Sequence, residues 1–171
     1  MKKICLTLII ITSILFSSNL EFNLKDVKNN EINIAVNKNG IKFKEFENKV
    51  ILLDFFGLAC PPCIASIPKL VSIQKNYKNS FEIVGVEVQN KLTIKQLKLF
   101  FKKFKINYTI INSKKADSLV SFISQITKWE GGIPFMLLID TKGQIRTIYR
   151  GIVNKTELSN DIEQLLKQKS I

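Results

Sequence analysis

The 171-residue sequence contains no histidine, only three cysteines and only two methionines. A structural zinc site needs about four cysteine or histidine ligands, and Cys5 is the only cysteine besides Cys60 and Cys63. A copper-handling role is disfavoured as well, because the nitrogen and thioether ligands that copper sites use are scarce or absent. We therefore expect no metal site and no other cofactor.

The N-terminal apolar run is too short for a confident transmembrane helix, which needs about 20 apolar residues. It extends from Ile4 to Phe16 and follows the basic start Met1-Lys2-Lys3. A basic start before a short apolar core is typical of a secretory signal peptide. The next residues, 17–19, contain no clean cleavage site. We expect residues 1–19 to be a signal peptide or an uncleaved membrane anchor, and residues 20–171 to form one domain in a periplasmic, secreted or inner-membrane-anchored protein.

Acidic residues are few: 14, against 26 lysines and arginines, for a net charge of +12. Such an excess can indicate binding to nucleic acid or to an anionic membrane surface. The lysines are scattered along nearly every segment, with no basic stripe interleaved with aromatic residues. We therefore expect no nucleic-acid partner. If the charge has a target, an anionic membrane surface fits it best.

The segment from Val50 to Leu70 contains the strongest signal. An apolar run that ends at Gly57 predicts a buried strand. Proline is favoured at the first position of a helix, so Pro61 places Cys60 at a helix N-terminus. The free amides and the helix dipole favour a thiolate there. Cys63 lies one turn further on, within reach of a disulfide.

A structural disulfide is the alternative interpretation of this pair. A four-residue disulfide loop restricts the unfolded chain very little, so it would stabilise the fold poorly. In an oxidising compartment, a lone pair of close cysteines persists only if a disulfide is its resting or working state. The spacing therefore favours a redox site.

Strands and helices alternate along the rest of the chain, which predicts a three-layer α/β sandwich with a parallel core. A closing strand pair adds antiparallel strands, so the central sheet is mixed. Residues 20–47 predict a small β-hairpin packed on one edge of this sheet. There are no internal repeats and no second domain. The predicted strands are 50–56, 81–89, 107–111, 135–140 and 144–150, and the predicted helices are 61–77, 93–104, 115–127 and one beginning at Thr156.

Two motifs together resemble a known family. Leu53-Asp54-Phe55-Phe56 leads into Cys60-Pro61-Pro62-Cys63, and Gly132-Ile133-Pro134 precedes another apolar strand. The combination resembles exported thioredoxin-like proteins of the TlpA/ResA type, from about Phe22 to the C-terminus. The resemblance implies a thioredoxin-like α/β/α sandwich with an added N-terminal β-hairpin.

The resemblance also implies roles for individual residues. Cys60 matches the exposed nucleophile, Cys63 the buried resolving thiol, and Pro134 a cis-proline whose loop holds the substrate chain. Asp54 matches a buried acid. A carboxylate in an apolar strand should have a raised pKa, which would suit it to accept the proton of Cys63; the alternative is a satisfied structural polar group. The implied substrate-binding residues are Pro61, Pro62, Gly132, Ile133 and Pro134.

Three positions depart from the family pattern. Ala59 replaces the usual tryptophan before the first cysteine, Asp54 stands where many exported relatives have asparagine, and Ser66 replaces a glutamate common among relatives that serve cytochrome c maturation. Trp129 is either a core residue or part of the substrate groove.

The expected function is thiol–disulfide exchange outside the cytoplasm. In the leading interpretation the protein reduces disulfides of exported proteins, with cytochrome c maturation as one candidate process, and takes electrons from a membrane thiol donor. The alternatives are an oxidant that donates disulfides and a redox-inert chaperone or binding module.

Overall fold

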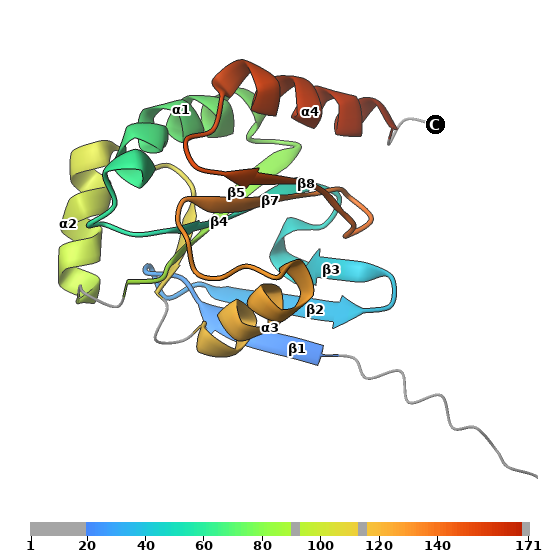
Figure 1. Cartoon of the computed structure of the whole chain (residues 1–171), viewed down its shortest axis with the longest axis horizontal. Helices are drawn as coiled ribbons and strands as arrows, with labels where there is room; N and C mark the ends of the chain where they lie inside the picture. The colour runs from blue at the N-terminus through green and yellow to red at the C-terminus, as the bar shows by residue number, and fades with distance from the viewer. Residues whose placement is uncertain (1–19, 90–92, 113–115, 169–171) are drawn as a thin grey trace, which may run out of the picture.

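The computed structural model describes residues 20–89, 93–112 and 116–168. Its central sheet contains five strands in the order β6-β5-β4-β7-β8 (Figure 1). β4 and β5 run parallel, as do β5 and β6, whereas β7 is antiparallel to both of its neighbours. The predicted mixed sheet is therefore confirmed. The strands are β4 (Val50–Phe56), β5 (Phe81–Glu87), β6 (Thr109–Asn112), β7 (Phe135–Ile139) and β8 (Ile145–Arg150).

The position of β4 at the centre of the sheet explains its composition. All seven of its residues are buried, because neighbouring strands and both outer layers cover it. Its side chains alternate between the two faces: Leu52 and Phe56 belong to one core cluster, and Leu53 and Phe55 to the other.

Three helices pack apolar side chains against the strands in the first cluster: α1 (Pro61–Tyr77), α2 (Ile94–Phe104) and α4 (Lys155–Gln168). In Figure 1, α1 and α4 cover the sheet from the same side. Cys60 and Cys63 both belong to this cluster. Thr93 begins α2 with a capping box, in which its hydroxyl and the side chain of Gln96 each accept a hydrogen bond from the other residue's backbone. Because Cys60 and Cys63 lie in this cluster, the candidate site is on this face of the sheet.

The opposite face is covered by α3 (Asp117–Thr127) and by a separate three-stranded antiparallel sheet. This small sheet consists of β1 (Leu20–Lys25), β2 (Glu31–Asn37) and β3 (Gly40–Phe43), followed by a 3-10 turn, η1 (Lys44–Phe46). The predicted N-terminal hairpin is the β1–β2 pair.

Two details of the hairpin prediction were wrong. A third strand is present, because Ile41 and Phe43 alternate with the exposed Lys42 and are buried on the same side as the apolar residues of β1 and β2. The small sheet also covers a face of the central sheet instead of lying on one edge. Burying a whole apolar face needs a broad surface. The contacts at its margins are local: a bridge to β6, in which Val27 N donates to Ile110 O at 3.0 Å, and a hydrogen bond from Ile41 N to the Gly143 carbonyl after β7 at 2.8 Å.

The predicted signal peptide or anchor, residues 1–19, lies outside the described residues. Within the ranges that the structure describes, no helix is long and apolar enough to cross a membrane.

Candidate active site at the start of helix α1

The turn between β4 and α1 brings the two cysteines together. Cys60 is the N-cap of α1, and Pro61 and Pro62 occupy its first positions. A disulfide joins Cys60 to Cys63, with their Cα atoms 5.3 Å apart. The Cys60 sulfur also accepts a hydrogen bond from the backbone N–H of Cys63 at 3.2 Å. A sulfur in this position receives the amide and dipole stabilisation that lowers a thiol pKa in the reduced form.

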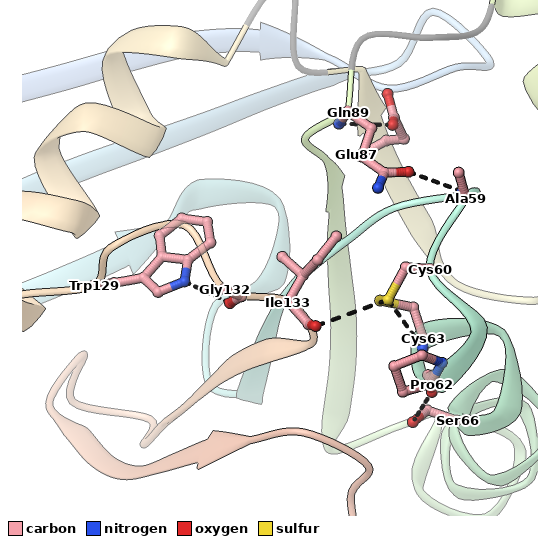
Figure 2. Close-up of a disulfide and its surroundings, with 10 residues drawn as sticks. All are labelled: Ala59, Cys60, Pro62, Cys63, Ser66, Glu87, Gln89, Trp129, Gly132 and Ile133. Carbon is pink, nitrogen blue, oxygen red and sulfur yellow. Dashed lines mark hydrogen bonds between the residues drawn. A yellow bond between two sulfur atoms is a disulfide. The ribbon is translucent and has the colours of Figure 1, made fainter.

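A loop from the far side of the sheet faces the disulfide. The Ile133–Pro134 peptide bond is cis, and the carbonyl oxygen of Ile133 lies 3.8 Å from the Cys60 sulfur (Figure 2). A disulfide sulfur carries no proton, so this is a close contact and not a hydrogen bond. The site therefore consists of two segments, 60–63 and 132–134, that are about 70 residues apart in the sequence.

Trp129 supports this loop from behind. Its indole N–H donates to the Gly132 carbonyl at 2.6 Å. Its ring stacks on that of Phe135, with centroids 4.8 Å apart and planes 4° from parallel. Trp129 is thus a core residue, 7% exposed, that also holds the loop. A depression of about 390 Å³ lies beside the loop, and Trp129, Ile133, Pro134 and Arg150 are among its lining residues.

The resemblance implies an exposed Cys60, and for the oxidised form that expectation is wrong. Cys60 is 6% exposed and Cys63 3% exposed. The reason is the loop: Ile133 packs against the same apolar cluster as both cysteines and shields the sulfur of Cys60. The sequence could not reveal this, because the shielding residue is 73 positions away.

Asp54 is the acid beneath the site. It is 2% exposed and, by strand alternation, lies on the same face of β4 as Leu52 and Phe56, toward the cysteines. No donor among the described residues reaches its Oδ1 atom, and no described hydrogen bond joins it to Cys63. Burial raises the pKa of Asp54 from 3.8 to about 7. The carboxyl therefore titrates close to neutral pH.

Tyr108 is a residue that the sequence analysis missed. It is buried in the same cluster as the cysteines. Burial raises its pKa well above 10, and the charge of Asp54 raises it further. The available signal was strand alternation, since Tyr108 is two residues from the buried Ile110.

The remaining predicted site residues border the disulfide. Pro61 is exposed and Pro62 half-buried. The Pro62 carbonyl accepts a hydrogen bond from the Ser66 hydroxyl at 3.1 Å, so the buried Ser66 is bonded to its own helix. Among the described residues there is no group of three or more histidine, cysteine or acidic side chains arranged to hold a metal ion.

A mixed five-stranded sheet, a CxxC pair at a helix N-terminus and a facing cis-proline loop together define a thiol–disulfide oxidoreductase of the thioredoxin type. The sequence comparison agrees. The chain belongs to the Redoxin family, whose model matches residues 21–166.

Individual relatives are distant. The chain is 24% identical to the thiol-disulfide oxidoreductase ResA of Geobacillus kaustophilus, over 85% of this chain and 74% of that protein. A thiol:disulfide interchange protein from Chlorobium tepidum has a TM-score of 0.69 at 22% identity, over 88% of this chain and 95% of that one. A secreted disulfide oxidoreductase of Mycobacterium tuberculosis has a TM-score of 0.61 at 18% identity, over 84% and 96%. These structures share the fold.

Proposed function

We propose that this protein reduces disulfides in exported proteins outside the cytoplasm, with Cys60 as the nucleophile. The observation that carries the proposal is the position of the Cys60 sulfur, which caps α1, accepts the Cys63 N–H and faces the Ile133 carbonyl. The helix N-terminus favours the thiolate of Cys60 over that of Cys63.

The reaction proceeds through two exchanges. In the reduced protein, the Cys60 thiolate attacks one sulfur of the substrate disulfide, which breaks that bond and releases the other sulfur as a thiolate. Cys63 then loses its proton and attacks Cys60, which frees the second substrate sulfur. The substrate gains two electrons, and the protein is left with the Cys60–Cys63 disulfide. A membrane thiol donor returns it to the dithiol.

Asp54 is the proposed acceptor of the Cys63 proton. Three observations support this role: its place on the same face as the cysteines, the absence of any described donor to Oδ1, and a pKa of about 7. A base with a pKa near the working pH both accepts and returns a proton readily.

The substrate chain is proposed to lie along Gly132, Ile133 and Pro134, pairing with them as a strand, with Pro61 and Pro62 forming the opposite rim. The depression beside the loop offers space for a side chain close to the substrate cysteine. Action outside the cytoplasm is supported by the basic start and apolar run of residues 1–16, and by the secreted relative.

A redox titration of the protein against glutathione tests the direction of electron flow. We expect a midpoint closer to the value of about −270 mV for thioredoxin than to the value of about −120 mV for a strong periplasmic oxidant of the same fold. A midpoint near the oxidant's value would favour disulfide donation. If the protein exchanged no disulfide with glutathione, that result would favour a redox-inert chaperone or binding module. Ser66 stands where relatives that serve cytochrome c maturation often have a glutamate, and its hydroxyl bonds to the Pro62 carbonyl of its own helix. The site therefore gives no separate support for a role in cytochrome c maturation.

A further inference from the structure

We propose that Gln89 is a positioning residue for Cys60. The side-chain oxygen of Gln89 accepts a hydrogen bond from the backbone N–H of Ala59 at 2.8 Å (Figure 2). Ala59 immediately precedes the nucleophilic cysteine, so this bond holds the peptide from which Cys60 extends. The inference depends on exchange at Cys60 and not on the direction of electron flow.

Gln89 is itself fixed at the end of β5. Its backbone N–H donates to the carboxylate Oε1 of Glu87 at 2.8 Å. Glu87 is fully buried, pairs in register with Phe56 of β4, and has no described donor to its second oxygen. The next residue, Val88, donates to the Phe56 carbonyl at 2.9 Å. The end of β5 is therefore hydrogen-bonded to β4 beside the turn that leads to the cysteines.

Gly57 provides the space that this arrangement needs. A Cβ atom at Gly57 would lie 2.3 Å from Cδ of Gln89, closer than any real contact. The Gln89 side chain thus lies directly against the Gly57 backbone and reaches Ala59 across it. A side chain at position 57 would displace the glutamine and break its bond to Ala59.

The hydrogen bond to Gln89 holds a turn that has no large side chain before Cys60. In the family that the sequence resembles, a tryptophan usually precedes the first cysteine, whereas Ala59 has only a methyl group. With no large side chain to anchor the turn, the hydrogen bond from Ala59 to Gln89 keeps Cys60 where its sulfur meets the Cys63 N–H, 3.2 Å away, and the Ile133 carbonyl, 3.8 Å away.

The variant Gln89→Met tests the bond with little change in side-chain size. We expect about a fivefold fall in kcat/KM with a protein disulfide, the size of effect that the loss of one neutral hydrogen bond gives. The Ala59 amide should exchange with solvent faster in NMR measurements, while the urea midpoint stays near that of the parent. Gln125→Met, on the exposed side of α3, is the matched control and should change none of these.

Two further variants separate positioning from general structural support. Gln89→Glu retains an oxygen acceptor, so the Ala59 amide should stay protected. Its added negative charge should shift the alkylation profile of Cys60 to higher pH, because a nearby negative charge disfavours the thiolate. Gly57→Ala should displace Gln89 and lower kcat/KM for disulfide exchange as Gln89→Met does. Combining the two substitutions should lower kcat/KM little further.

The inference is overturned if Gln89→Met has the same kcat/KM as the parent and the same rate of hydrogen exchange at the Ala59 amide. It is also overturned if the substitution lowers only the urea midpoint. Fully additive losses in the double variant would equally refute the linkage. Failure of the proposed function is a separate result, because it appears in the parent protein as absent exchange or an oxidising midpoint. The positioning role is measured as a ratio between variants.

Discussion

Replacing Asp54 with asparagine separates its proposed catalytic role from a structural one. The carboxyl is 2% exposed and its Oδ1 has no donor among the described residues. An ionised group in such a place costs free energy, which the neutral amide of similar shape does not. We therefore expect the variant to be more stable than the parent and slower in catalysis.

The pKa of Asp54 sets the size and the pH range of the stability change. Below pH 3.8 the carboxyl is protonated in both the folded and the unfolded chain, so the folded protein bears no ionisation penalty. Between pH 3.8 and about 7 the unfolded chain releases the proton and the folded protein keeps it, so stability falls as pH rises. Above about pH 7 the loss is complete. At 1.36 kcal/mol per pKa unit, it reaches about 4 kcal/mol.

Urea unfolding of the oxidised protein between pH 4 and pH 8 measures this effect. The advantage of Asp54→Asn over the parent should be close to zero at pH 4 and grow toward about 4 kcal/mol at pH 8. Glu47→Gln removes an exposed carboxylate and is the matched control; it should show no such trend.

Catalysis supplies the second half of the test. Turnover of a disulfide substrate near neutral pH should fall in Asp54→Asn, because Cys63 has lost its proton acceptor, while the first alkylation of Cys60 changes less. The reasoning is refuted if the variant unfolds more easily at pH 8 and turns over at the parent rate. Asp54 would then be a structural hydrogen-bonding group, and the proton would leave Cys63 through water.

Two further predictions concern the cysteines. In the reduced protein, brief alkylation followed by mass spectrometry should label Cys60 first, with a pKa below the free-thiol value of about 8.5; faster labelling of Cys63 would reverse their roles. Cys63→Ser should trap Cys60 in mixed disulfides with exported proteins, whereas Cys60→Ser should trap few. Equal trapping by both variants would contradict the division into nucleophile and resolving thiol.

Local signals were sufficient to predict most elements. The helix predicted to begin at Pro61 is α1, because a proline at the first helical position needs no hydrogen-bond partner from elsewhere. The start of α2 was predicted in the same way, from its N-cap residue Thr93. The third N-terminal strand was missed because its four residues contain only two buried positions, Ile41 and Phe43, too few for a clear period of two.

By itself, the sequence determined the CxxC pair and most of the elements around it, and it predicted the other candidate site residues, because helix starts and strand alternation depend on neighbouring residues. Only the tertiary structure decided how those residues are placed. The burial of Cys60 depends on Ile133, 73 positions away, and the lack of a donor to Asp54 Oδ1 among the described residues depends on what surrounds it across the sheet. The bond from Ala59 to Gln89 joins two strand ends, 30 positions apart, that meet only because β4 and β5 run parallel. Contacts of this kind leave no periodic pattern in the sequence, since each depends on the packing of segments that are distant along the chain.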